Sequence, residues 1–384
     1  MSLSRAVDLT QRLLRCQSVT PNDGGALPLL ADMLRDAGFT VDLVSFSGPG
    51  EAEILNLYAR IGTVSPCLVF AGHTDVVPPG NPAAWRFDPF SGEIADGMIW
   101  GRGACDMKGG VAASIAAALD HVEGAGAPKG SIAFLITGDE EGPAINGTVK
   151  LLDWVMARGE SFDACVLGEP TNPNALGDMV KIGRRGSLTG EIVVHGRLGH
   201  VAYPHLASNP IPPLLRILVA LTDAPLDKGT SNFDASNLEV VTVDTGNPST
   251  NVIPAEARAR FNIRFNDRWT PETLRAEVQT RVDTASAGAD VSLDFMPCNA
   301  LAFLTGPGRF TTLVADAVEA ETGLRPVLST TGGTSDARFI SAHCPVVEFG
   351  LVGRTMHAID ERVAIADIDR LTAVYGRIIT SFLT

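Results

Sequence analysis

Apolar and polar positions alternate along roughly the first 180 residues in a way typical of an α/β domain. Short apolar runs predict five strands, at residues 39–46, 53–61, 67–71, 131–137 and 165–167. Helical spacing of apolar residues predicts four helices, at residues 4–15, 25–37, 109–122 and 146–158. Strands and helices that alternate in this order build a sheet covered by helices.

The pattern changes near residue 182. Alternation with a period of two predicts four half-exposed strands, at residues 191–195, 238–244, 257–265 and 291–295. Asn209-Pro210 and Thr270-Pro271 are typical helix starts, so two helices are expected to follow them. This segment therefore indicates an α+β domain with a four-stranded antiparallel sheet and two helices.

The α/β pattern resumes from about residue 296. It predicts a strand at 346–349 and three helices, at residues 308–322, 334–341 and 366–382. We therefore predict an α/β domain of residues 1–181 and 296–384, with a mixed, mainly parallel sheet between helices. Residues 182–295 are predicted to form a second domain inserted into the first.

Composition narrows the classes of partner. The hydrophobic fraction of 45% is ordinary for a globular protein, and the formal net charge of -14 argues against a nucleic-acid or acidic-membrane partner. No run approaches the roughly 18 apolar residues that a membrane helix needs. The first fifteen residues, with Arg5, Arg12 and Arg15, do not resemble a signal peptide, so a cytoplasmic location is predicted. The six cysteines lack a CxxC spacing and are expected to act as small apolar residues rather than as ligands or disulfides.

Seven acidic and histidine residues stand at the ends of apolar runs: His73, Asp75, Asp106, Glu140, Glu141, Glu169 and His357. Carboxylates and imidazoles that a fold brings together make sites for divalent metals. The set exceeds the ligands of one tetrahedral zinc, whereas two metals that share a bridging carboxylate need about five protein ligands. The surplus would supply a base and an orienting group, so the pattern indicates a two-metal hydrolase.

Each motif also has a purely structural interpretation when it is considered alone. His73 and Asp75 lie two residues apart on one face of a strand end, so Asp75 would accept the second ring N–H of His73. A buried His–Asp pair without a metal would show the same spacing. Asp106 follows a glycine-rich turn that would aim it inward, although an aspartate before a helix is often only its N-cap.

Three carboxylates in a row, Asp139, Glu140 and Glu141, follow a strongly apolar strand. Adjacent side chains point in opposite directions, so one would bind metal while its neighbour faces the substrate. An acidic surface loop is the alternative, but it would not normally follow so apolar a strand. Glu169 and His357 are weak evidence individually. Their joint occurrence with the other motifs favours one site, because ligands of open α/β sheets gather beyond the carboxyl ends of the strands.

The inserted domain offers candidate groups for binding substrate. His200, in a glycine-flanked loop, would stabilise an oxyanion or else lie in solvent at a hairpin end. Further polar residues are suited to holding carboxylates, although surface arginines are common: Arg184, Arg185, Ser187, Asn251 and Arg264. Beyond this domain, the turn that contains Gly332 and Gly333 would offer N–H groups to an anion or simply cap the helix that follows.

Together these fragments resemble the two-zinc metallopeptidases and N-acyl-amino-acid deacylases of the aminoacylase and carboxypeptidase superfamily. The resemblance spans nearly the whole chain and rests on His73-Thr-Asp75, Gly103-Ala-Cys-Asp106-Met-Lys-Gly, Asp139-Glu-Glu141, Gly168-Glu169-Pro-Thr, Gly199-His200 and His357. Four further segments look more like the branch that removes succinyl groups from diaminopimelate than like the branch that deacetylates acetylornithine. They are residues 183–187, 202–210, 251–254 and 330–339.

The resemblance implies a role for each matching residue. His73, Asp106 and Glu169 would hold one zinc, and Asp106, Glu141 and His357 would hold the other, with Co²⁺ or Mn²⁺ able to substitute. Glu140 would be the general base and Asp75 would orient His73. His200 would reach the active site of the partner subunit in a homodimer formed through the inserted domains. A cis peptide is expected after Asp106. The expected substrate contacts are Arg184, Ser187, Tyr203, Asn251, Arg264, Thr331, Gly332 and Gly333.

The reaction implied by the resemblance is removal of succinate from N-succinyl-L,L-2,6-diaminopimelate to give L,L-diaminopimelate, for lysine and cell-wall synthesis. Arg184 and Arg264 are expected to hold the succinyl carboxylate. One alternative is acetylornithine deacetylase-like or dipeptidase activity at the same site. Another is a non-catalytic amino-acid or peptide binder that retains a metal site. Glu140 favours an enzyme, because a binder has no need of a carboxylate that does not bind metal.

Overall fold

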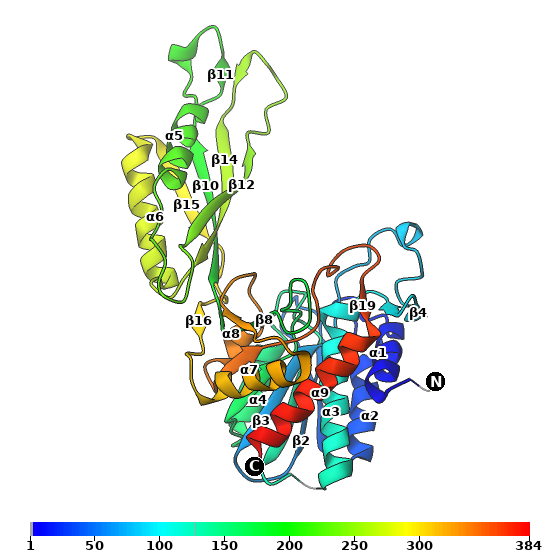
Figure 1. The fold of residues 1–384 in the computed structure, drawn as a ribbon. Helices are drawn as coiled ribbons and strands as arrows, with labels where there is room; N and C mark the ends of the chain where they lie inside the picture. The colour runs from blue at the N-terminus through cyan, green and yellow to red at the C-terminus, as the bar shows by residue number, and fades with distance from the viewer. Residues whose placement is uncertain (1–2, 127) are drawn as a thin grey trace. The chain divides into compact units, whose positions relative to one another are not determined.

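An eight-stranded mixed sheet forms the centre of the larger of two units in the computed structural model, which describes residues 3–126 and 128–384. Unit 1 contains the described residues up to Ile182 together with Thr305–Ser329 and Ser335–Thr384. Unit 2 contains Gly183–Leu304 and Thr330–Thr334. Each unit is described by itself below (Figure 1).

The sheet of unit 1 has the strand order β1-β2-β6-β3-β7-β18-β8-β17. Its strands are β1 Thr40–Phe46, β2 Ile54–Ile61, β3 Cys67–His73, β6 Ser131–Thr137, β7 Ala164–Leu167, β8 Met179–Lys181, β17 Val327–Ser329 and β18 Val346–Glu348. Strand β3 pairs in parallel with both β6 and β7, and β7 pairs in parallel with β18. The carboxyl ends of these four central strands therefore lie along one edge of the sheet.

Apolar periodicity placed most helices of unit 1 correctly. They are α1 Arg5–Arg15, α2 Ala26–Asp36, α3 Gly109–Ala125, α4 Thr148–Ala157, α7 Arg309–Thr322, α8 Ala337–Ile340 and α9 Ile365–Phe382. Helix α3 is alanine-rich, and its residues Gly109–Leu119 are buried. Figure 1 shows it alongside α9, and ring contact between Phe70 and Tyr375 connects α9 to the central strand β3. The small side chains of α3 are needed because this helix is enclosed on several sides.

The sequence did not predict several short elements. A three-stranded sheet forms from β4 Glu93–Ala95, β5 Met98–Trp100 and β19 Arg362–Ala364. These three strands have three residues each and carry too little alternation to be recognised by periodicity. The predicted helix at 334–341 is also shorter than expected, because only Ala337–Ile340 are helical. The three-stranded sheet matters for the site, because it joins the turn after Trp100 to the loop before Arg362.

Unit 2 is built on a four-stranded antiparallel sheet with the order β12-β14-β10-β15. Its elements are β9 Gly183–Arg184, β10 Gly186–His195, β11 Gly199–His200, α5 Ile211–Thr222, β12 Asn237–Asp244, β13 Val252–Ile253, β14 Glu256–Phe265, α6 Pro271–Ser286, β15 Asp290–Phe295 and β16 Phe303–Leu304. Apolar side chains of both helices, including Leu214 and Leu274, pack with Ile192 and Phe261 of the sheet in one core. This is the predicted α+β arrangement, so the expected fold class is confirmed for both units.

The unit limits differ slightly from the domain limits expected from the sequence. Residues 296–304 and Thr330–Thr334 belong to unit 2, whereas the sequence pattern assigned them to the α/β domain. Backbone pairing explains the first segment, since β16 pairs with β9 and Ala300 bridges to Ser187. Such pairings have no local sequence signal. Among the described residues, no helix combines the length and the apolar character needed to cross a membrane.

Candidate metal centre

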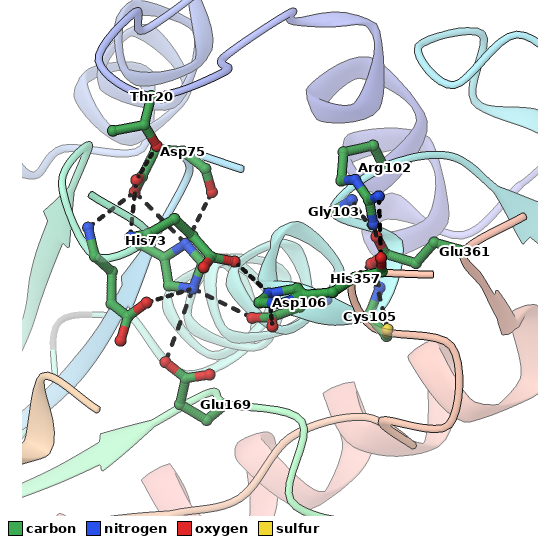
Figure 2. A network of polar contacts seen from close by, with 12 residues as sticks. Thr20, His73, Asp75, Arg102, Gly103, Cys105, Asp106, Glu169, His357 and Glu361 are labelled. Carbon is green, nitrogen blue, oxygen red and sulfur yellow. Dashed lines mark hydrogen bonds and ion pairs between the residues drawn. The ribbon is translucent and has the colours of Figure 1, made fainter. Parts of the chain in front are cut away.

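The carboxyl edge of the large sheet collects the candidate ligands. His73 is the last residue of β3, the pair Glu140 and Glu141 follows β6, and Glu169 follows β7. Since β3, β6 and β7 are parallel neighbours, residues that follow them meet at one edge (Figure 2). Asp106 reaches the same place from the turn Ala104–Lys108 before α3.

One half of the site is centred on His73. Its Nε2 lies 3.3 Å from Oδ1 of Asp106, 3.8 Å from Oε1 of Glu169 and 4.0 Å from Oε2 of Glu140. His73, Asp106 and Glu169 are buried. A single atom placed between these groups would contact an imidazole nitrogen and several carboxylate oxygens. Figure 2 shows their side chains converging.

The other half is centred on His357, which lies in the loop between β18 and β19. Its Nε2 is 2.8 Å from Oε1 of Glu141 and 3.2 Å from Oδ2 of Asp106. Asp106 therefore presents one carboxylate oxygen to His73 and the other to His357. This arrangement suits a carboxylate that bridges two cations. The peptide bond between Asp106 and Met107 is cis, as the resemblance implied.

The residues present suit divalent metal ions. Nε2 of His73 and Oε1 of Glu169 are buried and have no hydrogen-bond partner among the described residues. Buried polar atoms are normally satisfied, so an unsatisfied pair aimed at a common point indicates a missing partner. Ligand atoms of His73, Asp106 and Glu141 lie within 4.8 Å of one another, and so do those of His73, Glu140 and Glu169. Imidazole and carboxylate donors are those that Zn²⁺ accepts.

The electrostatics of the cluster lead to the same interpretation. Burial raises the pKa of Glu140 to about 8, and the negative charges of Asp336, Glu141 and Asp106 add to this effect. Burial, with the charges of Asp106 and Glu140, also raises the pKa of Glu169 well above its ordinary value. Hydrogen bonds to Asp106 and Glu141 raise the pKa of His357 to about 10. The site thus concentrates carboxylates that favour the uptake of positive charge.

Asp75 is connected differently from the expectation. The prediction paired the His73 ring with the Asp75 carboxylate, but Nδ1 of His73 lies 2.9 Å from the backbone carbonyl of Asp75 and 3.6 Å from Oδ1. The buried carboxylate instead accepts hydrogen bonds from the backbone N–H groups of Glu140 and Glu141, at 3.2 and 3.0 Å. The hydroxyl of Thr20 donates a further bond of 2.6 Å. The Asp75 carboxylate therefore holds the turn that carries Glu140 and Glu141, called the acidic turn below. The backbone carbonyl of Asp75 orients the His73 ring.

Three residues of the centre were not singled out as site residues from the sequence: Thr20, Arg102 and Glu361. Arg102 and Glu361 form a buried ion pair of 2.7 Å, and Figure 2 shows it beside Asp106. Glu361 follows His357 by four residues, so its proximity to a ligand was visible in the sequence. Thr20 lies in the segment between α1 and α2, where no pattern pointed to the site.

The candidate residues of unit 2 form two separate groups. His200, Tyr203 and Asn251 are exposed and lie together, because the N–H of Val201 donates to the carbonyl of Asn251 and the rings of His200 and Tyr203 are 5.7 Å apart. Ser187 and Arg264 instead face each other across β10 and β14. Arg184 joins this second group, and its Nη1 donates to the carbonyl of Gly333, next to Gly332 and Thr331.

These groups lie at opposite ends of the unit 2 sheet. Strand β10 runs over ten residues from Gly186 to His195, which corresponds to roughly 30 Å. Arg184 precedes the strand and His200 follows it. Figure 1 shows β11, which carries His200, and β16, the partner of β9, at the two ends of this unit.

Comparison with known proteins identifies the family of the chain. A family model described as peptidase family M20/M25/M40 matches residues 69–381. The chain is 65% identical over 384 residues to a succinyl-diaminopimelate desuccinylase of Methylorubrum extorquens (strain PA1), covering all of both chains. It is 60% identical over 377 residues to the succinyl-diaminopimelate desuccinylase of Beijerinckia indica, covering 98% of each.

Solved structures share the fold at low sequence identity. Aminopeptidase PepT from Bacillus cereus matches with a TM-score of 0.80 and 20% identity, over 99% of this chain and 98% of that one. Human carnosine dipeptidase 1 matches with a TM-score of 0.75 and 18% identity, over 98% and 96%. The family match extends over most of the chain and includes every candidate metal ligand. The chain therefore belongs to peptidase family M20/M25/M40.

Proposed function

We propose that this protein is a metal-dependent amide hydrolase that removes succinate from N-succinyl-L,L-2,6-diaminopimelate and releases L,L-diaminopimelate for lysine and cell-wall synthesis. One observation carries the proposal. Asp106 offers separate oxygens to His73 and His357, in a chain that is 65% identical over its full length to a succinyl-diaminopimelate desuccinylase.

The metal complement is proposed to be two Zn²⁺ ions per subunit, with Co²⁺ or Mn²⁺ able to substitute. His73, Asp106 and Glu169 would hold one ion, and Asp106, Glu141 and His357 the other. The distances of 2.8 to 3.8 Å between these side chains support both sets. When bound, the ions would polarise the substrate carbonyl and lower the pKa of a water molecule.

Glu140 is proposed as the general base. Its carboxylate lies 4.0 Å from His73, so it is next to the first metal position. A carboxylate at this place would accept a proton from water and then return it to the leaving amine. Asp75 supports this role, because it holds the backbone N–H of Glu140.

The substrate contacts are proposed from the chemistry of unit 2. The succinyl group ends in a carboxylate, and Arg184 and Arg264 supply guanidinium groups at the same end of the sheet. Arg184→Ala should raise KM for the succinylated substrate by about tenfold, the loss of one charged hydrogen bond. Arg35→Ala, at the exposed end of α2, is the control and should leave KM unchanged. An unchanged KM in Arg184→Ala would remove Arg184 from this role.

A homodimer through unit 2 is proposed to complete the site. Strand β12 is an edge strand of its sheet and exposes Val241 and Val243, and α5 exposes Leu215 and Val219. Apolar side chains along an open edge favour pairing with a second copy. The roughly 30 Å between His200 and Arg184 separates two groups assigned to one small substrate. The proposal resolves this separation, since His200 would serve the partner's site and stabilise the oxyanion there.

Mixing two inactive variants tests this sharing. Glu140→Gln lacks the base and His200→Ala lacks the oxyanion donor, so each homodimer should be nearly inactive. After subunit exchange, half of the dimers are mixed, and each mixed dimer has one complete site. Activity should then recover to about a quarter of the wild-type value. Recovery would not occur if His200 acted on the site of its own chain.

The substrate is tested by comparing acyl groups. Metal-loaded protein should hydrolyse N-succinyl-L,L-2,6-diaminopimelate with a kcat/KM at least a hundredfold above that for N-acetylornithine or a dipeptide. A preference for either of the latter would support the alternative activities of the same site. Binding of the succinylated substrate without turnover in the zinc-loaded protein would indicate a non-catalytic binder. Removal of metal with a chelator should abolish activity, and added Zn²⁺ should restore it.

A further inference from the structure

Glu361 is a fully buried acidic residue that the proposed reaction leaves without a role. It lies immediately before β19, which pairs with β5, and the N–H of Gly101 donates to its backbone carbonyl at 2.9 Å. This pairing directs the Glu361 side chain into the turn that carries Asp106. Figure 2 shows the carboxylate surrounded by the atoms of that turn.

Each oxygen of the Glu361 carboxylate accepts more than one hydrogen bond. Oε2 accepts from Nη1 of Arg102 at 2.7 Å and from the N–H of Gly103 at 2.9 Å. Oε1 accepts from the N–H of Cys105 at 3.0 Å, the N–H of Asp106 at 3.2 Å and the thiol of Cys105 at 3.3 Å. All five donors belong to residues 102–106.

The ion pair also reaches the loop that carries His357. Nη2 of Arg102 lies 3.5 Å from the backbone carbonyl of His357, and Arg102 stacks over the ring of Trp85. His357 has a φ of 58°, which is uncommon for a residue other than glycine and depends on support from its surroundings. Glu361 and His357 also share one short loop. The pair therefore connects the two segments that carry Asp106 and His357.

A buried charge is tolerated only when hydrogen bonds and a counter-charge compensate its loss of hydration. Glu361 meets this condition entirely with donors from one turn. The arrangement matches that of Asp75, whose carboxylate holds the N–H groups of Glu140 and Glu141. In both cases a carboxylate outside the ligand set holds the backbone from which ligands project.

We propose that Glu361 is a positioning residue. It fixes the bridging carboxylate of Asp106, and through Arg102 it fixes the His357 loop, in the geometry that binds the metal held by Asp106, Glu141 and His357. This inference rests on the proposed two-metal site. Partners of metal ligands commonly contribute 10- to 100-fold in metal affinity. A merely structural ion pair would instead affect stability and leave the metal affinity of the folded protein unchanged.

Metal titration of the metal-free protein distinguishes these two roles. Wild-type protein and Glu361→Gln are titrated with Zn²⁺ against a chromophoric chelator, and then with Co²⁺, whose visible spectrum reports ligand geometry. The wild type should bind two equivalents. Glu361→Gln should weaken one binding step by about 10- to 100-fold and change the Co²⁺ spectrum of that step. The other step should weaken by a smaller factor, because that position shares Asp106 but takes its other two ligands, His73 and Glu169, from separate strands.

Asp227→Asn provides the matched control. Asp227 also collects donors with its carboxylate, from Gly229, Ser236, Asn266 and Trp269, but these residues all belong to unit 2. Asp227→Asn should lower stability and leave both zinc affinities unchanged. Equal weakening of zinc binding in the control would overturn the proposal, because it would show a general effect of instability.

A second variant keeps the test decisive if Glu361→Gln does not fold. Glu361→Asp retains a charge beside Arg102 but withdraws the carboxylate by about 1.5 Å, one C–C bond. It cannot keep the contacts to Arg102 and to the N–H groups of Cys105 and Asp106 together, so the same zinc step should weaken. Wild-type zinc affinities in either folded variant would overturn the role of Glu361. Failure of the wild type to bind two equivalents would overturn the two-metal proposal itself.

Discussion

Asp75→Asn separates two possible tasks of this aspartate. The substitution leaves the backbone carbonyl of residue 75 in place, so the 2.9 Å contact with Nδ1 of His73 remains. It changes only the carboxylate, which accepts from the N–H groups of Glu140 and Glu141 and from the hydroxyl of Thr20. The lost hydrogen bonds therefore belong to the turn that carries Glu140 and Glu141, and the His73 ring loses only the Asp75 charge, which lies 3.6 Å from its Nδ1.

The size of the effect follows from the geometry. Oδ1 faces the N–H of Glu140 and Oδ2 faces the N–H of Glu141. Either orientation of an asparagine amide therefore leaves one backbone N–H opposite another donor. The hydroxyl of Thr20 is able to rotate and accept, so it does not add to the loss. One hydrogen bond to a charged acceptor contributes about 1.5–3 kcal/mol, and the free energy of unfolding should fall by that amount.

Activity should fall as well, because Glu140 and Glu141 move when their backbone anchor is lost. A displacement of about 1 Å at a reacting group costs on the order of 100-fold in rate. We expect kcat to fall between 10- and 100-fold. Urea unfolding of the metal-free protein, followed by circular dichroism, gives the stability, and hydrolysis of the succinylated substrate gives kcat.

Thr20→Val is the matched control. It removes one donor to Asp75 and keeps both backbone contacts, so the free energy of unfolding should fall by only about 1 kcal/mol and kcat should stay within threefold. The reasoning would be refuted if Asp75→Asn kept wild-type kcat and stability. It would also be refuted if Thr20→Val impaired kcat as strongly as Asp75→Asn.

Three further predictions concern the base, the helix beside the site and the inserted unit. Glu140→Gln should lower kcat by about 10²–10⁴-fold while zinc content and KM stay unchanged, and loss of zinc would instead identify Glu140 as a ligand. Gly110→Ala should lower the free energy of unfolding by about 1–3 kcal/mol, because a Cβ at Gly110 would lie 2.5 Å from the carbonyl oxygen of Gly168. Gly124→Ala, on the same helix and with nothing within 4 Å, should not lower it. Partial burial raises the pKa of Asp227, but hydrogen bonds from its neighbours outweigh burial and lower that pKa from 3.8 to about 2. Its contribution, about 1 kcal/mol after allowance for solvent screening, is complete above pH 3.8 and is lost as the pH falls towards 2, so acid unfolding of Asp227→Asn should lack this component.

The order of strands and helices followed from local periodicity. Residues 67–71 and 132–136 are all apolar because β3 and β6 are buried on both faces. Alternation at 257–265 correctly indicated a strand with one buried face, which is the burial pattern of β14. These signals are local, so they are readable without the fold. Apart from β18, which the apolar run at 346–349 predicted, the two- and three-residue strands carry no such signal, since tertiary pairing alone creates them.

The residue types of the candidate centre were also readable from the sequence, because His73 ends an apolar strand and Glu140, Glu141 and Glu169 follow apolar strands. Motif spacing fixed the residue types and suggested metal binding. It did not determine which oxygen of Asp106 faces which histidine. That depends on how the turn before α3 meets the His357 loop, and these segments are distant in the chain.

The sequence by itself therefore determined the periodic elements, the fold class and the set of residues able to bind metal, because each depends on local patterns of polarity and residue type. Only the tertiary structure decided how the ligands are held. The Asp75 carboxylate holds the acidic turn rather than the His73 ring, and Glu361 holds the turn around Asp106. Both arrangements join backbone N–H groups to carboxylates from remote segments. A backbone N–H is present at nearly every residue, so the sequence carries no mark of which ones are used.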